Sequence, residues 1–212
     1  MLGVIHIKAT LLLLITSALA YANTNDTIII NVPEGKSITR WNECSPIVMQ
    51  SYYKKFQLGM LSLASPSLTY LKISGLSFAF HHATPLVYRL SFEGQCRIPE
   101  SGSVFLIEFI YDDHLLLNGD QLVLNDGRNW MYQTPSHWHK PSMGAYHEIC
   151  IHSDIVQLPS GTHIVDAGIQ LLAPFPNTAI ILSAGKLIVE LIQYSSNVNH
   201  GLPMLPLGSM IG

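Results

Sequence analysis

The densest apolar run after the first 22 residues spans positions 104–111, and Glu108 is its only polar member. The other residues of the run are β-branched, aromatic or leucine, which fits a pleated strand buried on one or both faces. A turn-like stretch precedes the run, and further apolar runs lie on both sides of it. We therefore expect positions 91–111 to hold the end of one strand, a turn and a central strand around which the others pack.

Alternation with period two marks two more strands. Positions 86–92 place large apolar residues such as Leu86, Tyr88 and Leu90 at every second position. Positions 146–152 alternate as well, with Cys150 and His152 on one face. This pattern is typical of half-buried strands.

Turn signals separate the apolar runs. Asn118-Gly119 predicts a hairpin, because both residues accept a positive φ. Pro159-Ser160-Gly161 predicts a second hairpin, between 155–158 and 162–173, and 81–84 and 125–141 are predicted to be loops. Ser74-Gly75 and Ser183-Ala184-Gly185 are interpreted as breaks between separate strands. The remaining predicted strands are 27–32, 47–53, 68–73, 76–80, 178–182 and 186–194. So many short strands at regular spacing predict an all-β fold, an antiparallel β-sandwich or jelly roll.

The ends of the chain differ from its middle. Residues 1–22 combine an apolar run with small residues at alternate positions near Ala20 and Ala22, which predicts a secretory signal peptide and a secreted, extracellular protein. No later stretch reaches transmembrane length without a charge or a turn. Residues 23–194 are expected to form one β-sandwich domain, followed by an apolar C-terminal arm over 195–212.

Charge is scarce. Only 12% of residues are charged, against about 25% in ordinary soluble proteins. Removal of the signal peptide and its Lys8 leaves 10 basic against 14 acidic residues, too few positive charges for binding nucleic acid. The sequon at Asn25 predicts one glycan, which shields only the N-terminus. We expect self-association into a homo-oligomer, a trimer or a filament, to cover the remaining surface.

Both ends offer apolar segments for such contacts. An uncharged arm interrupted by two prolines either folds back over its own sandwich or lies across a neighbouring subunit, and the low surface charge favours the neighbour. The N-terminal strand is expected to complete a partner's sheet edge in the same way. The candidate assembly residues are Ile28, Ile30, Leu202, Met204, Leu205, Leu207 and Ile211.

Three cysteines, Cys44, Cys96 and Cys150, are expected in an oxidising compartment. An odd number allows one intrachain bridge with a lone thiol, or one intermolecular bridge. Cys96 and Cys150 lie in strand contexts, whereas Cys44 lies in a loop-like stretch, and the pairing stays open at this point.

Three segments in order resemble the globular heads of the C1q/TNF-like jelly-roll superfamily. They are FEGQCRIPESG at 92–102, which leads into the central run, LPSGTH at 158–163 and SAGKLI at 183–188. The resemblance covers about half of the mature chain and lacks a collagen-like stem. It implies a jelly-roll fold and trimer-like assembly, and it carries over no ligand and no binding residue.

Histidines offer the best candidate metal ligands. His137 and His139 flank Trp138 at a spacing of two, and His147 follows nearby, so zinc or copper is one possibility. Calcium is a second, because oxygen ligands gather around one hairpin, at Asp112, Asp113, Asn118, Asp120, Asn125 and Asp126. Neither set has the spacing of a known metal motif, and incidental polar loops are the alternative.

No catalytic motif is present, and the chain is not expected to be an enzyme. Three aromatic residues of the 125–141 region, Trp130, Tyr132 and Trp138, either cover one end of the sandwich or form a platform for a ligand. The predicted function is a secreted structural or adhesive protein that self-assembles through sandwich faces and terminal arms. The alternative is a soluble carbohydrate- or receptor-binding module, of the lectin-like or C1q/TNF-like kind, that binds glycans or a cell-surface protein.

Overall fold

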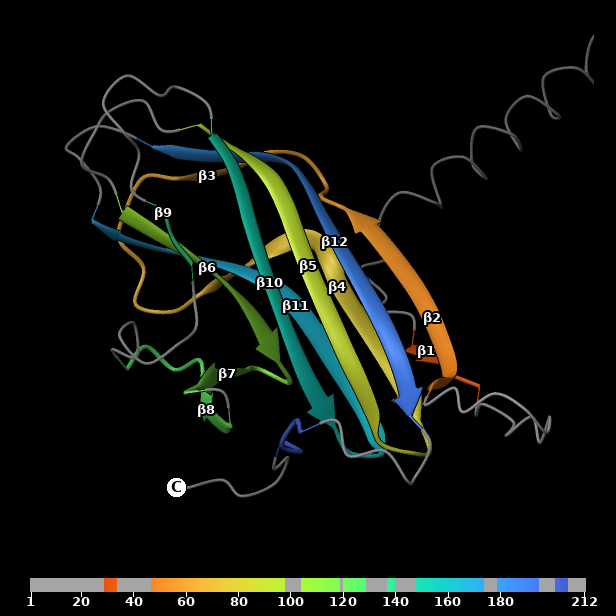
Figure 1. Ribbon diagram of the computed structural model, residues 1–212. Helices are drawn as coiled ribbons and strands as arrows, with labels where there is room; N and C mark the ends of the chain where they lie inside the picture. Colours follow the sequence, from red (N-terminus) through yellow and green to blue (C-terminus); the bar gives the residue numbers. More distant parts are fainter. Residues whose placement is uncertain are drawn as a thin grey trace, which may run out of the picture.

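Two β-sheets stack face to face in the computed structural model (Figure 1). The structure describes residues 29–33, 47–97, 104–118, 120–128, 137–139, 148–173, 179–194 and 201–205. All regular structure within these ranges is β-strand. None of it is a helix that could cross a membrane.

The larger sheet has seven strands, and all its neighbours are antiparallel except β1 and β4. Its order is β1 (Ile29–Asn31), β4 (Leu71–His82), β11 (Gly161–Ala173), β6 (Val104–Tyr111), β7 (His114–Leu117) and β8 (Gln121–Leu124), with β9 (His137–His139) also paired to β6. The smaller sheet has five antiparallel strands. Its order is β10 (Glu148–Leu158), β5 (Leu86–Arg97), β12 (Ile180–Tyr194) and β2 (Ile47–Phe56), with β3 (Leu61–Leu63) also paired to β12.

The pairing is nested. Strand β2 pairs with β12, β4 with β11, β5 with β10, and β6 with β7. The first of these strands therefore meets the last, the second meets the last but one, and the innermost two are adjacent along the chain. This rolled-up arrangement over two sheets is a jelly roll, so the predicted fold class is confirmed.

The predicted central strand is β6, and it is buried on both faces. Alternate side chains, among them Phe105 and Phe109, belong to the main core between the sheets. Leu106 and Ile110 point the other way and form a second apolar cluster with Tyr70 and Leu115. The uninterrupted apolar run thus reflects a strand with no solvent-facing side.

Two predicted strand breaks are wrong. Ser74-Gly75 lies within the continuous strand β4, where Gly75 has a φ of 82°. Ser183-Ala184-Gly185 lies within β12, where the register against β5 shifts between Ser183 and Lys186. Residues typical of turns here form β-bulges, which bend a strand without ending it. The bulge in β12 is filled by Gln57, whose Nε2 donates to the Leu182 carbonyl and whose Oε1 accepts from the Gly185 amide.

Four further predictions are settled by the strand assignments and their pairing. The Asn118 hairpin is confirmed, because β7 pairs with β8 around it. The Pro159–Gly161 hairpin is wrong: β10 and β11 belong to different sheets, so this turn crosses from one layer of the sandwich to the other. His81 and His82 belong to β4 and not to a loop. Part of the predicted loop 125–141 is strand β9.

The described parts of both terminal segments dock on their own chain, which corrects the preference for a neighbouring subunit. Strand β1 pairs with β4, and Ile30 packs against the main core. Near the other end, Leu205 is buried in that core and its amide donates to the Gln157 carbonyl at 2.9 Å. These contacts are available within one chain because both segments lie beside open sheet edges. Leu202 is half-buried and Met204 exposed, whereas Ile28, Leu207 and Ile211 lie outside the described residues.

The disulfide joins Cys96 of β5 to Cys150 of β10. Both side chains are buried and face the core. The residue directly opposite Cys150 is Gly94, which has no side chain, so the sulfur atom reaches diagonally to Cys96. Cys44 and the sequon at Asn25 lie outside the described residues.

Loss of this bridge should weaken the fold. The bridge links residues 54 positions apart, and the loop-entropy model gives about 4 kcal/mol for a loop of that length. We expect Cys96→Ala/Cys150→Ala to lower the free energy of unfolding by about that amount, as measured by urea denaturation. The matched control is Cys44→Ser, which leaves the bridge intact. Equal stability of the double variant and the control would contradict the prediction.

Candidate functional site

The outer face of the smaller sheet is the candidate site. It is the face turned away from the larger sheet, and strands β10, β5, β12 and β2 form it side by side (Figure 1). The register aligns its outward residues in rows, such as Ile155, Arg89, Glu190 and Tyr52, one from each strand. We call this surface the open face.

Apolar side chains gather along both margins of the open face. On β10, Ile149, Ile151 and Ile155 are 64%, 54% and 44% exposed. On β2, at the opposite margin, Tyr52 and Phe56 are 65% and 62% exposed. Alternation explains both sets, because successive strand residues point to opposite faces and these five share the outward one. Exposed apolar residues arranged in this way are typical of an interaction surface.

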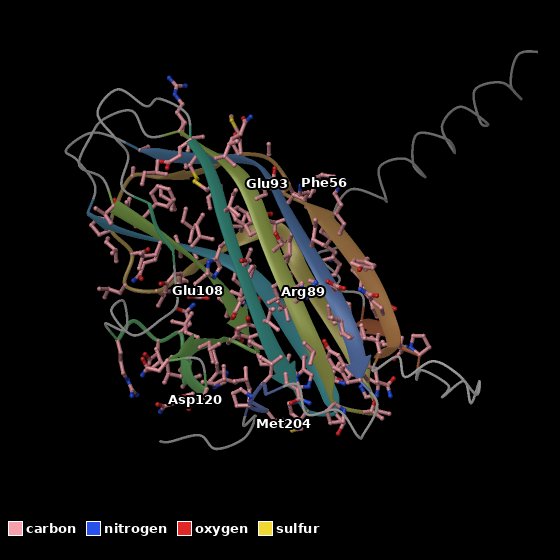
Figure 2. All side chains as sticks on the ribbon, viewed as in Figure 1. Phe56, Arg89, Glu93, Glu108, Asp120 and Met204 are labelled. Atoms are coloured by element: carbon pink, nitrogen blue, oxygen red, sulfur yellow. A yellow bond between two sulfur atoms is a disulfide. The ribbon has the colours of Figure 1, made fainter. Side chains whose placement is uncertain are left out.

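Four of the charges between the margins are paired across strands. Arg89 Nη1 lies 3.1 Å from Glu190 Oε2, and Lys186 Nζ lies 2.7 Å from Glu93 Oε2. Figure 2 shows Arg89, Glu93 and Phe56 on this sheet. Lys54, which has no carboxylate partner among the described residues, places its Nζ 4.6 Å from the centre of the Phe56 ring.

Glu190 is the most enclosed charge on the open face. Its carboxylate accepts hydrogen bonds from Gln50 and Arg89. Burial acts to raise the pKa of Glu190, but the hydrogen bonds from Gln50 and Tyr52 and the charge of Arg89 outweigh it and hold the pKa below its usual value. Glu190 is therefore a carboxylate at neutral pH and has its partners within the chain.

A second polar group lies inside the sandwich, where β6 and β10 come together. Glu108 is fully buried, and its Oε1 accepts the amide of Phe109 at 2.9 Å and lies 3.2 Å from His152 Nε2. The amide of Phe109 falls between the part of β6 paired with β9 and the part paired with β7. Glu108 thus accepts a hydrogen bond from the backbone amide of the next residue in its own strand. Burial raises the pKa of Glu108, although His152 and the Phe109 amide act to lower it.

A histidine pair lies at the end of the sandwich where the chain crosses between sheets. His163 Nδ1 lies 2.9 Å from Asp112 Oδ2, and its Nε2 lies 2.9 Å from the Pro159 carbonyl. These two contacts hold the His163 ring against Asp112 and against the turn that crosses between the sheets.

His82 is the second histidine of this pair, and both nitrogen atoms of its ring have partners. Its Nδ1 lies 2.7 Å from the Thr84 carbonyl and its Nε2 lies 2.8 Å from the Tyr88 hydroxyl. A neutral ring satisfies both partners, because Nδ1–H donates to Thr84 and Nε2 accepts from Tyr88. The His163 ring lies 5.2 Å away. Burial lowers the pKa of His82; the hydrogen bond to Thr84 opposes this, and His163 and His81 add to it.

The oxygen atoms of the acidic hairpin contact other groups of the chain, and the calcium hypothesis stays a prediction. Asp112 Oδ1 accepts the amide of Ile164 at 2.6 Å, and Asp113 lies 2.6 Å from Lys72 Nζ. Asn125 both donates to and accepts from the backbone of Tyr70. These contacts fix the hairpin to its neighbours. Asn118 and Asp120 flank the β7–β8 turn, and Asp126 pairs with Arg128.

The histidine metal hypothesis stays a prediction. His137 and His139 lie on β9, whose backbone pairs with β6, while His147 lies outside the described residues. Trp138 is placed by its backbone opposite Leu106, and Trp130 and Tyr132 also fall outside. Within the part of the chain that the structure describes, no three His, Cys, Asp or Glu side chains come together as a metal site.

Sequence reasoning missed the open face, the Glu108–His152 contact and the histidine pair. The alternation of Ile149, Ile151 and Ile155 contains the signal for the first, since they share a face of one strand. The other two join residues of distant strands, such as Glu108 and His152, which are 44 positions apart. No local pattern contains that information.

Acid should destabilise the fold through His82. A histidine with a lowered folded pKa stabilises the native state above its unfolded pKa of about 6.5, and this contribution is lost as the pH falls through the folded pKa. We expect the free energy of unfolding, measured in urea from pH 7.5 to pH 5, to fall less steeply for His82→Gln than for the wild type. His81→Gln, an exposed neighbour on the same strand, is the control. Parallel profiles for all three proteins would contradict this assignment.

Comparison with known proteins identifies no family. No protein-family model matches the chain, and no curated protein matches it. Among solved structures, the chain is similar to structures of infectious bursal disease virus, Gx strain and Gt strain, at 9% and 12% identity, each with a TM-score of 0.40. The matches cover 74% and 81% of this chain, which spans only 35% and 40% of those chains. At this level of likeness the fold assignment rests on the strand order alone, and the C1q/TNF resemblance stays a prediction.

Proposed function

We propose that this chain is a secreted structural or adhesive protein that self-assembles through the open face. The observation that carries the proposal is the combination of apolar margins with the two ion pairs that lie between them. Covering an unpaired charge costs free energy, because the charge loses its water. Here Arg89, Glu190, Lys186 and Glu93 already have partners, so covering the open face leaves none of the four unpaired.

The open face is large enough for a stable contact. The four strands at about 4.8 Å spacing and the 11 residues of β10 at about 3.4 Å each give roughly 37 by 19 Å, or about 700 Å² per copy. Two such faces bury about 1,400 Å², which falls within the usual range of specific interfaces. One contact between two open faces is therefore large enough to hold two copies together.

Composition points in the same direction. With 12% charged residues, the chain has few groups to keep its whole surface hydrated, and the open face is where large apolar side chains remain exposed in the greatest number on one sheet. The described terminal segments pack on their own chain, so the sheet face replaces the arms as the main surface for assembly.

Secretion is supported by two independent features. The first 22 residues have the pattern of a signal peptide. The Cys96–Cys150 disulfide is of the kind that forms and persists in oxidising compartments. The jelly-roll strand order is also the fold that the C1q/TNF resemblance implies, and trimers are the form of assembly expected from that resemblance.

A charge placed in the middle of the open face should dissociate the assembly. Ile188 of β12 is half-buried there, between Ser91 and Lys54 of the adjacent strands. We expect Ile188→Lys to shift the native protein to monomers in sedimentation velocity, because the added ammonium loses its water without a partner. Ile164→Lys, on an exposed position of the larger sheet, is the matched control and should assemble as the wild type does.

Two results would overturn the proposed function. One is a wild-type protein that stays monomeric across the micromolar range. The other is equal dissociation of the Ile188→Lys and Ile164→Lys variants, which would mean that any added charge disrupts the particle. Circular dichroism of both variants establishes that the fold is retained.

A further inference from the structure

Strand β10 is an edge strand whose outer side is almost unoccupied. It pairs with β5 over its whole length, from Glu148 to Leu158. On the other side, the only partner within the described ranges is the C-terminal segment, where Met204 bridges to Gln157. The amide of Leu205 donates to the Gln157 carbonyl at 2.9 Å. This contact shows that the edge accepts an added strand, and it leaves Ile149–Ile155 open.

The two edges of the smaller sheet differ in how they are protected. Edge strands are usually guarded against pairing with other chains by lysine, proline, bulges or short length. Strand β2, at the far edge, has Lys54 and Lys55. Strand β10 has 11 residues, no lysine, arginine or proline, and no register shift against β5.

The inward polar residues of β10 do not guard its edge either. His152 Nε2 lies 3.2 Å from Glu108 Oε1, and Asp154 Oδ2 accepts from the Tyr111 hydroxyl at 2.8 Å. Both side chains are therefore engaged inside the sandwich. The Cys96–Cys150 bridge joins one end of β10 to β5, and the C-terminal segment holds the other end at Gln157. The strand is thus presented as a straight, fixed edge.

We propose that β10 pairs antiparallel with β10 of a second copy about a two-fold axis, which joins two smaller sheets into one continuous sheet across the dimer. The proposal rests on the proposed self-assembly and adds to the open face a second contact, along the β10 edge, with a defined symmetry. The C-terminal segment blocks Gln157, so the open stretch Ile149–Ile155 is centred on His152, and the axis passes there.

A second copy fits this edge because the proposed register places uncharged residues opposite one another. With the axis at His152, Ile149 lies opposite Ile155 of the partner subunit, and Ile151 lies opposite Ser153 of the partner subunit. All of these outward residues are uncharged, so self-pairing brings no like charges together, which would destabilise a directly opposed pair. The isoleucines of the two copies then form one apolar band across the centre of the enlarged open face.

Single cysteines test the pairing directly. In a Cys44→Ser background, so that the introduced thiol is the only one outside the Cys96–Cys150 bridge, Ile151→Cys and Ser153→Cys are prepared separately and then mixed under mild oxidation. The two positions lie directly opposite in the proposed register, at a Cβ separation of about 5 Å. We expect the mixture to form several-fold more disulfide-linked dimer than either variant alone.

Ser91→Cys is the discriminating control, because Ser91 lies on β5 in the middle of the open face. Cross-linking through Ser91→Cys, with no excess in the mixture, means that copies stack face to face, which overturns edge pairing and leaves the proposed function intact. Monomers of the wild type in sedimentation overturn both proposals. Cross-linking in the mixture but not with Ser91→Cys supports pairing along β10. Thermal unfolding of each variant establishes that it is folded before oxidation.

Discussion

The burial of β6 on both faces is the constraint on which the rest of the structure depends. One side of the strand needs the main core between the sheets, and the other needs a separate cover, since a strand without a solvent face must be packed twice. Tyr70 and Leu115 provide part of that cover. The segment before β4 is held over the outer side by Gln170, which donates to the carbonyls of Ser67 and Leu68. The outer side of the larger sheet is thus covered around β6, although Ile164 of β11 stays exposed, whereas the described residues leave the outer face of the smaller sheet open.

This difference between the sheets explains how much of the fold the sequence predicts. Composition identifies β6, and alternation identifies β5 and β10, because both signals depend only on which side of a strand is buried. Which strands pair with each other cannot be read from these local patterns. Gly75 and Gly161 have the same local turn chemistry, yet Gly75 lies in a bulge within β4, whereas Gly161 begins β11 after a turn that crosses from one sheet to the other. Only the nested pairing, fixed by long-range packing, separates these outcomes.

The candidate site likewise combines features that local sequence patterns predict with features that they do not. Alternation assigns Ile149, Ile151 and Ile155 to one face of a strand, but it does not tell whether another element covers that face. The charge pairs depend on register, since Arg89 and Glu190 are 101 positions apart. The sequence predicts that Cys96 and Cys150 lie in strands, but it leaves the disulfide pairing open. Its diagonal geometry follows from the register, which places Cys150 opposite Gly94 and Cys96 opposite Glu148.

Buried polar groups connect the inward side of β10 to β6. Glu108 Oε1 contacts His152 and Asp154 accepts from the Tyr111 hydroxyl between β6 and β10, whereas Glu108 Oε2 and Glu148 Oε2 are buried without a hydrogen-bond partner among the described residues. The outward side of β10 has only neutral residues, and among the described residues its outer edge pairs only at Gln157. An apolar strand with an open edge is a template for pairing with another chain. The position of β10 at the margin of the open face makes that gain available to a second copy of the same molecule.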